Sequence, residues 1–112
     1  MSTTPERVVF LKKIHLFSGL PDDDITDVAE ALVDQPFKPG DVILDQNTHG
    51  DTFFIIFKGT VKVVRQRGKP QEQTLANLVA QDFFGEEELF SNKARSASII
   101  ATSEGSLLVL QK

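Results

Sequence analysis

Cysteine is absent from this sequence of 112 residues. Its absence excludes disulfide bonds, thiol nucleophiles and thiolate metal ligands, and it is consistent with a reducing cytoplasm. Long apolar runs are also absent: the longest strongly apolar run, residues 53–57, is far shorter than the roughly 20 residues of a membrane span. The polar residues 1–7 contain no apolar core of a signal peptide. We therefore expect a cytoplasmic domain without a membrane span.

A surplus of basic residues is also lacking. Twelve lysines and arginines stand against 16 aspartates and glutamates, so the formal net charge is −4. Modules that bind nucleic acid usually carry a basic footprint, and the chain as a whole has none. We therefore expect no direct contact with nucleic acid. The length and the hydrophobic content of 40% fit one packed domain.

Histidine is scarce, with only His15 and His49 in the chain. Zinc and iron sites need several histidine and carboxylate ligands at suitable spacing, and metal-binding β-barrel enzymes use two or three histidines close together. Neither histidine belongs to such a set, and no Gly-x-Ser-x-Gly nucleophile elbow is present. We therefore expect neither an enzyme nor a metal centre, and a metal-dependent β-barrel enzyme is the most distant alternative.

The first third of the chain carries apolar residues at helical spacing. Residues 9–17 place them on roughly one face of a short helix. Residues 18–21 include a glycine and a proline, which interrupt it. A second helix is expected next, capped by Asp22 or Asp23 and ended by Pro36. Its apolar positions recur at spacings of three and four: Ile25, Val28, Ala29, Leu32 and Val33.

After Pro36, short apolar runs alternate with turn signals. Turns are expected at residues 39–41, 47–51 and 66–73. Strands are expected between and after them, at residues 42–44, 53–57, 61–65, 74–79, 98–102 and 107–110. Short strands about ten residues apart indicate an all-β sandwich or barrel. A parallel α/β fold would need helices between the strands, and there is room for only one short helix, near residues 86–90.

The residues that carry chemistry lie between positions 84 and 99. Gly85 leads into a short helical turn, whose first N–H groups have no internal partner and can bind a phosphate. Arg95 follows ten residues later, entering a strand, and its planar guanidinium matches phosphate oxygens. Ser96 adds a hydroxyl donor, and the carboxylate of Glu86 can accept from a sugar hydroxyl. A site that binds an anionic phosphate and a sugar diol together is typical of nucleotide binding.

This pattern resembles the phosphate-binding segment of the cyclic-nucleotide-binding domain family. The family includes the catabolite activator protein, the regulatory subunits of cAMP-dependent protein kinase and nucleotide-gated channels. Residues 10–21, 39–43, 51–56 and 58–63 are also similar to its N-terminal helices, first turn and central strands. At the site itself, the resemblance rests on a glycine and an acid, then an arginine with two small residues: Gly85, Glu86, Leu89, Arg95, Ser96 and Ala97.

The resemblance implies a mainly β fold for a single domain over residues 1–112. Helices would occupy residues 1–35. Residues 36–112 would form an antiparallel β-roll, or jelly roll, of about eight strands, with a short helix in the phosphate-binding loop. We expect the C-terminal helix that serves as a lid in this family to be absent from these residues.

The resemblance also implies reversible sensing of cAMP or cGMP. The domain would control an effector domain or partner protein outside these residues, and a homodimer remains an open alternative. Arg95 would pair with the cyclic phosphate, and Glu86 would accept from the ribose 2′-hydroxyl. Ser96 suits either nucleotide and does not choose between them. The phosphate or the sugar edge would be approached by the backbone N–H groups of Gly85, Glu88 and Ala97.

Three positions depart from the family's usual pattern. Glu87 and Glu88 stand where an apolar residue and then alanine or serine are usual, and a carboxylate near a phosphate repels it unless it points to solvent. Both acids can instead complement a helix dipole. Gln81 stands where a glycine often precedes Asp82, which changes the shape of the loop more than its chemistry. The acids leave an alternative function open, a degenerate fold of this type that acts as a protein-interaction module without nucleotide.

Overall fold

The computed structural model describes residues 2–46, 52–85 and 97–111. Within these ranges, two α-helices, α1 (Thr4–Leu11) and α2 (Asp22–Ala31), flank a short 3-10 helix, η1 (His15–Phe17). All of the strand pairs are antiparallel, which confirms the predicted mainly β fold with N-terminal helices. Eight strands are described: β1 (Val33–Phe37), β2 (Val42–Leu44), β3 (Thr52–Lys58), β4 (Val61–Arg65), β5 (Gln73–Leu78), β6 (Phe83–Phe84), β7 (Ser98–Ala101) and β8 (Gly105–Gln111).

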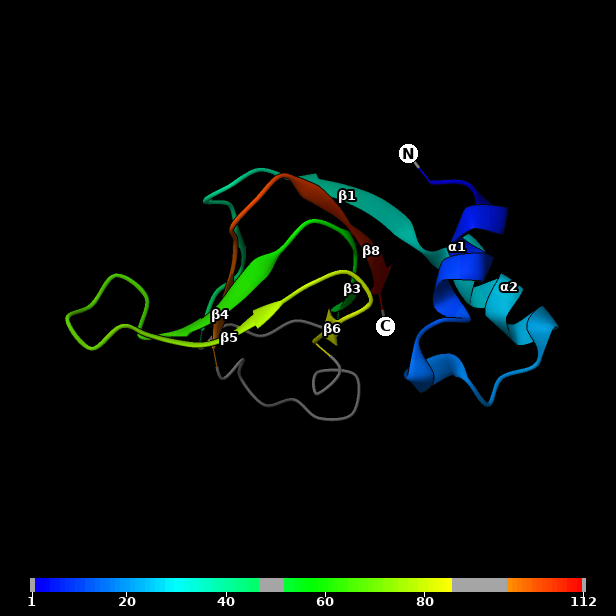
Figure 1. Cartoon of the computed structure of the whole chain (residues 1–112), viewed down its shortest axis with the longest axis horizontal. Helices are drawn as coiled ribbons and strands as arrows, with labels where there is room; N and C mark the ends of the chain where they lie inside the picture. The colour runs from blue at the N-terminus through cyan, green and yellow to red at the C-terminus, as the bar shows by residue number, and fades with distance from the viewer. Residues whose placement is uncertain (1, 47–51, 86–96, 112) are drawn as a thin grey trace.

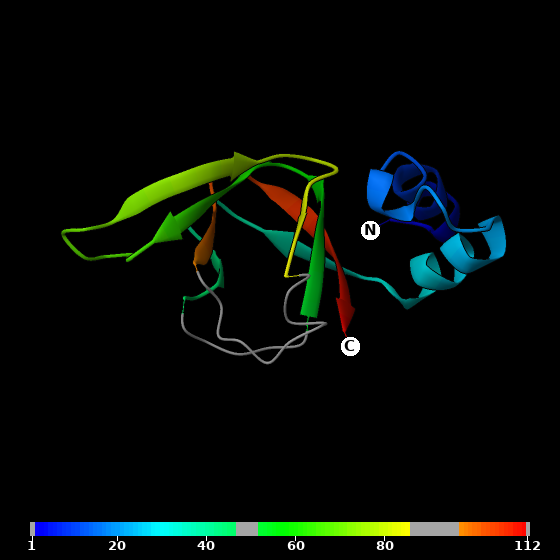
Figure 2. The same ribbon diagram turned by 90° about the horizontal axis from the view of Figure 1, so that it is seen from below.

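The strands form two four-stranded sheets. Their orders are β1-β8-β3-β6 and β2-β7-β4-β5. The helices gather at one end of the molecule, and the β4–β5 hairpin extends at the other (Figures 1 and 2). An apolar core lies between the sheets, and its large members include Phe54, Ile56, Phe84, Ile99 and Leu107. Two layers closed around this core make the β-roll.

The position of β3 explains why residues 53–57 are apolar without alternation. Phe54 and Ile56 belong to the core between the sheets. Phe53 and Ile55 belong to a second cluster, which they share with buried residues of α1 and α2. Successive residues of a strand point to opposite faces, and both faces of β3 are covered. The helices therefore pack on the outer face of the first sheet.

The first helix begins and ends earlier than its apolar pattern predicted. It starts at Thr4 because Thr3 and Glu6 form a capping box: the hydroxyl of Thr3 accepts from the N–H of Glu6, and the carboxylate of Glu6 accepts from the N–H of Thr3. The helix ends at Leu11, and η1 carries the next apolar residues into the core. The expectation of one helix over residues 9–17 is therefore wrong. No helix in the described ranges is both long and apolar enough to cross a membrane.

The second helix starts where the sequence predicted but ends before Pro36. Pro21 is the N-cap, so neither Asp22 nor Asp23 caps the helix. Both lie in the first turn, where acids complement the helix dipole. The helix ends at Ala31, and Pro36 lies within β1, at the edge of its sheet, where a residue without an N–H is tolerated. The β-roll therefore begins at Val33 rather than at residue 36.

Arg7 joins both helices to β1 although it is charged and only 9% exposed. Its Nη1 donates to the carbonyl oxygens of Ala29 (3.0 Å) and Leu32 (2.7 Å) at the end of α2, and its Nη2 pairs with Asp34. Ser2 also donates to Asp34. Burial alone would raise the pKa of Asp34, but hydrogen bonds from Ser2 and Arg7 outweigh it and hold this pKa below its ordinary value of 3.8.

Asp34→Asn should therefore destabilise the fold in a pH-dependent way. A carboxylate whose pKa falls on folding stabilises the protein above its unfolded-state pKa, and this contribution is lost as the pH falls through the lower folded-state value. We expect the substitution to lower the free energy of unfolding by about 2 kcal/mol at pH 7, the scale of hydrogen bonds to a charged group. The loss should be much smaller at about pH 2. Urea unfolding of both proteins measures this, and an equal loss at both pH values would contradict it.

Candidate functional site

Two of the six predicted site residues lie in the described part of the chain. Gly85 directly follows β6, at the edge of the first sheet, and Ala97 directly precedes β7, inside the second sheet. The chain thus leaves one sheet at Gly85 and joins the other at Ala97. The other four lie outside the described residues, as do Glu87, Leu89 and the expected short helix at residues 86–90, so their roles stay predictions: Glu86, Glu88, Arg95 and Ser96.

The Gly85 end of the site is held by an aromatic pair. Phe84 is buried, pairs with Phe54 of β3, and stacks on its ring with centroids 4.9 Å apart and planes 14° apart. The backbone of Gly85 then has φ of +89°, a left-handed conformation that residues with a Cβ seldom adopt. The glycine therefore lets the chain turn immediately after a fixed ring, at the point where the sequence pattern expects open backbone N–H groups.

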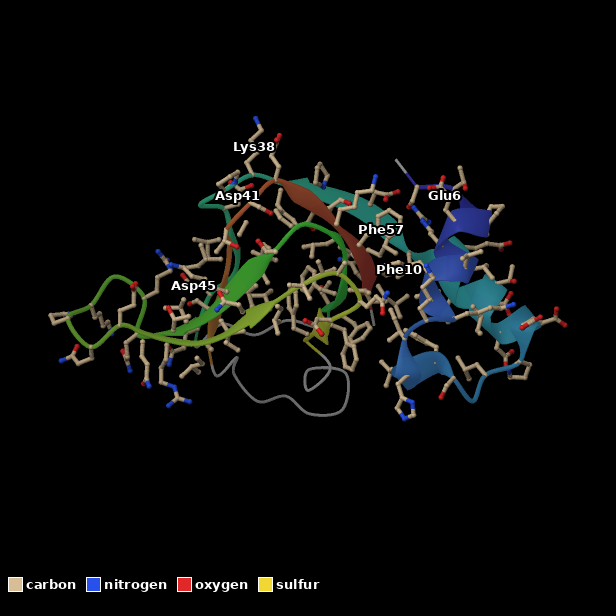
Figure 3. The ribbon with its side chains drawn as sticks, in the orientation of Figure 1. Glu6, Phe10, Lys38, Asp41, Asp45 and Phe57 are labelled. Carbon is tan, nitrogen blue, oxygen red and sulfur yellow. The ribbon has the colours of Figure 1, made fainter. Side chains whose placement is uncertain are left out.

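The Ala97 end is held by a polar network that sequence reasoning missed. Ser98, the first residue of β7, is fully buried. Its hydroxyl donates to Asp45 Oδ1 at 2.8 Å and accepts from the N–H of Gln46 at 2.9 Å. Asp45 also pairs with Arg67 of the β4–β5 hairpin at 3.0 Å. Figure 3 shows Asp45 toward the hairpin end of the molecule, away from the helices. No local sequence motif predicts these contacts, because they join residues far apart in sequence.

The same network sets the local charge. Hydrogen bonds from Arg67 and Ser98 hold the pKa of Asp45 below its ordinary value against a small opposing effect of burial. The hydrogen bond to Asp45 raises the pKa of Arg67. Both groups are therefore ionised at neutral pH. The negative charge next to Ser98 is balanced by a guanidinium, which lessens its repulsion of an anion bound nearby.

The described surface also has hollows whose lining residues lie outside β6 and β7. A groove of about 280 Å³ lies between α1 and the first sheet, and none of its lining residues belongs to β6 or β7. Its walls include Glu6 and Phe57, which Figure 3 places at the helical end. In the three described ranges, no three histidine, aspartate or glutamate side chains gather as metal ligands would.

The turn before β6 contains a strained residue. Gln81 has φ of +81°, which favours glycine, and this is a position where the family that the sequence resembles often has a glycine. The turn is fixed on both sides, since the N–H of Gln81 donates to the carbonyl oxygen of Ile56 at 2.9 Å and Asp82 Oδ2 accepts from the N–H of Val79 at 2.8 Å. A non-glycine side chain therefore occupies a left-handed backbone position in this turn.

Gln81→Gly should stabilise the protein. The substitution removes a left-handed strain of roughly 1–2 kcal/mol and adds a glycine entropy cost of roughly 0.5–1 kcal/mol, which leaves a net gain of about 0.8 kcal/mol at the midpoints of the two ranges. Thermal unfolding measures the gain. Ala80→Gly is the matched control, because Ala80 is exposed without a positive φ and should lose stability. A loss of stability in both variants would contradict the strain at Gln81.

Comparison with known proteins places this arrangement in a family. The cyclic nucleotide-binding domain family matches residues 34–112. Human cGMP-dependent protein kinase 2 is 39% identical over 93 residues, which are 82% of this chain and 12% of the kinase. The regulatory domain of Toxoplasma gondii PKA, solved with cAMP, has a TM-score of 0.89 and 28% identity over 96% of this chain and 42% of its own.

A further structural relative is the regulatory subunit of a cAMP-independent protein kinase A from Trypanosoma brucei. It was solved as a mutant bound to cAMP in its A site, with a TM-score of 0.87 and 29% identity over 96% of this chain and 40% of its own. The chain thus spans a small part of the kinase and less than half of each regulatory structure. The family match includes both sheets, the strand ends at Gly85 and Ala97 and the segment between them that the sequence pattern singled out, and this chain therefore belongs to the cyclic nucleotide-binding domain family.

Proposed function

We propose that this domain reversibly binds cAMP or cGMP and thereby controls an effector outside these residues. The observation that carries the proposal is the family match over residues 34–112, in a chain that has Arg95 ten residues after the left-handed Gly85. No bond of the nucleotide is made or broken. Binding would shift the population of two conformations, by an amount that the ligand's difference in affinity for them limits.

Each predicted residue has a distinct chemical task in this proposal. Arg95 pairs its guanidinium with the cyclic phosphate, and Ser96 supplies a hydroxyl next to it. Glu86 accepts a hydrogen bond from the ribose 2′-hydroxyl. Backbone N–H groups of Gly85, Glu88 and Ala97 approach the phosphate or the sugar edge. The support within the described residues is that Gly85 directly follows β6 and Ala97 directly precedes β7.

Calorimetric titration with cAMP, cGMP and guanosine tests the proposal. We expect saturable binding of one equivalent of at least one cyclic nucleotide, and weaker binding of guanosine because it lacks the phosphate. The ratio between cAMP and cGMP then assigns the base preference. A folded protein that binds neither cyclic nucleotide would contradict the proposal and would favour the interaction module without nucleotide.

The Trypanosoma brucei relative supports a specific role for Glu88. Its cAMP-bound mutant has a glutamate replaced by alanine and, seven positions later, a threonine replaced by arginine. In this chain Glu88 stands seven positions before Arg95. On this spacing, Glu88 and Arg95 would correspond to those two positions, and the chain would combine the arginine of that mutant with the acid that the mutant lost. An acid at this spacing would weaken phosphate binding by charge repulsion.

Glu88→Ala should therefore tighten cyclic nucleotide binding by about fivefold. This factor corresponds to the repulsion between the phosphate and a unit negative charge a few ångströms away in water. The backbone N–H assigned to position 88 is kept. Glu87→Ala is the charge-matched control and should change the affinity less. The readout is the dissociation constant from the same titration. Weaker binding by the Glu88 variant, or an equal gain from both variants, would contradict the specific role of Glu88.

A further inference from the structure

The start of β7 contains a buried polar side chain with a complete set of partners. Ser98 is 0% exposed and lies in the middle of a sheet, paired with Val64 of β4. A buried hydroxyl without partners is costly, and this one donates to Asp45 at 2.8 Å and accepts from Gln46 at 2.9 Å. The position of Ser98 is therefore fixed by directional bonds as well as by the strand ladder.

Asp45 extends this anchor to the β4–β5 hairpin. Its Oδ1 accepts from Ser98, and its Oδ2 lies 3.0 Å from Arg67 Nη2. A parallel link joins the same elements, since the N–H of Gln66 donates to Gln46 Oε1 at 2.8 Å. We call Asp45, Arg67 and Ser98 the Asp45 cluster. It ties the end of β2, the hairpin and the start of β7 together.

The cluster lies next to the predicted phosphate arginine along the chain. Ser98 stands three positions after Arg95, and a chain of three residues spans at most roughly 10 Å even when fully extended. The fixed position of Ser98 therefore limits where the backbone of the arginine can lie. Two charge-assisted hydrogen bonds from a planar guanidinium require a well-fixed geometry.

We propose that the Asp45 cluster is a positioning device for the phosphate site. The inference rests on the proposed function and adds three positioning residues to it, none of which contacts the nucleotide. Ser98 fixes the backbone that leads to Arg95, Asp45 holds Ser98, and Arg67 orients and neutralises Asp45. The hairpin is thereby coupled to the ligand, so that changes at Arg67 alter nucleotide affinity.

Arg67→Ala provides the sharpest test, because the Arg67 side chain is 38% exposed and its loss should leave the fold intact. We expect cyclic nucleotide affinity to fall by about three- to tenfold, with the thermal unfolding midpoint of the free protein nearly unchanged. Arg67→Lys keeps the charge beside Asp45 and should restore part of the affinity. Arg65→Ala is the matched control, since Arg65 is an exposed cation of the same hairpin with no ion pair to a described residue.

Ser98→Ala and the double variant with Arg67→Ala complete the test. Each single change should weaken binding, and the double variant should lose less than the product of the two losses, because both act through Asp45. If wild type binds and Arg95→Ala weakens it while Arg67→Ala and Arg65→Ala are alike, the positioning role is wrong and the proposed function stands. If wild type binds no cyclic nucleotide, both fail. If Ser98→Ala loses only stability, Ser98 is merely structural and the proposal is overturned.

Discussion

Arg95→Ala is expected to weaken cyclic nucleotide binding by at least about 100-fold, the largest effect of any single change in the site. Removing one partner of a desolvated, hydrogen-bonded charge pair costs roughly 2–5 kcal/mol, and each 1.4 kcal/mol is a factor of about ten in the dissociation constant. The loss is large because the phosphate keeps its charge and has no replacement partner. Titration calorimetry of the variant, compared with wild type at the same ionic strength, gives the ratio directly.

Two further variants show whether the loss belongs to this guanidinium. Arg95→Lys keeps the charge but not the planar fork, so we expect an intermediate loss. Arg65→Ala removes the same charge at the exposed end of β4 and should leave the affinity almost unchanged. Circular dichroism of each variant checks the fold. If Arg95→Ala bound as tightly as wild type, the phosphate would have another partner and the assignment of Arg95 would be wrong.

Gly105→Ala is expected to destabilise the fold by about 3 kcal/mol, although the change adds only one methyl group. A Cβ at Gly105 would overlap the backbone carbonyl of Lys58 and would lie 2.6 Å from the ring of Phe37. Overlap with a side chain can be relieved by rotation, but overlap with the backbone of a paired strand cannot. Lys58 belongs to β3 and Gly105 to β8, so relief would require the two central strands of the first sheet to separate.

The control for this effect is Gly19→Ala, because a Cβ at Gly19 would meet no atom within 4 Å. We expect that variant to unfold at nearly the wild-type urea concentration. Gly59 gives a second reference: it has φ of +91°, and a Cβ there would lie 2.5 Å from the carbonyl oxygen of Glu104. Gly59→Ala should therefore behave like Gly105→Ala. Equal midpoints for Gly105→Ala and Gly19→Ala would contradict the proposed close approach of β3 and β8.

Much of the β-roll could be predicted because its signals are local. Gly40 has a positive φ and stands in the turn that the sequence indicated at residues 39–41. The expected strands near residues 53–57, 61–65 and 107–110 correspond to β3, β4 and β8. Residues 53–57 and 61–65 are rich in β-branched or aromatic residues, which favour strands, and residues 107–110 form an apolar run preceded by a glycine and a serine.

The helices were predicted less well because apolar spacing does not fix where a helix begins. Residues 14 and 17 continue the apolar stripe of α1, but both lie beyond that helix: Ile14 is the N-cap of η1, and Phe17 is its last residue. The capping box of Thr3 and Glu6 was the signal that marks the start. Pro36 was taken as a helix end, whereas it occupies an edge strand, and sequence alone does not reveal which strand lies at an edge.

In the site too, features that depend on local sequence were predicted, and contacts between distant residues were not. The sequence singled out Gly85 from its place in a short motif, and the structure adds that its backbone is left-handed. The roles of Asp45, Arg67 and Ser98 were not predicted, because their contacts join residues 22 and 53 apart along the chain. In the sequence, Asp45 is an ordinary polar residue after a strand, and Ser98 is one small residue in an apolar run. Only the packing of β2 and the hairpin around β7 gives them a role.

The most direct test of the central claim is a crystal structure of the domain grown with cAMP or cGMP. We predict the cyclic phosphate within roughly 3 Å of the Arg95 guanidinium, the distance of a charge-assisted hydrogen bond, and the ribose 2′-hydroxyl beside Glu86. The nucleotide should lie against the chain between Gly85 and Ala97. A nucleotide bound at another surface, or one whose phosphate faces solvent while Arg95 pairs with Glu87 or Glu88, would contradict this claim.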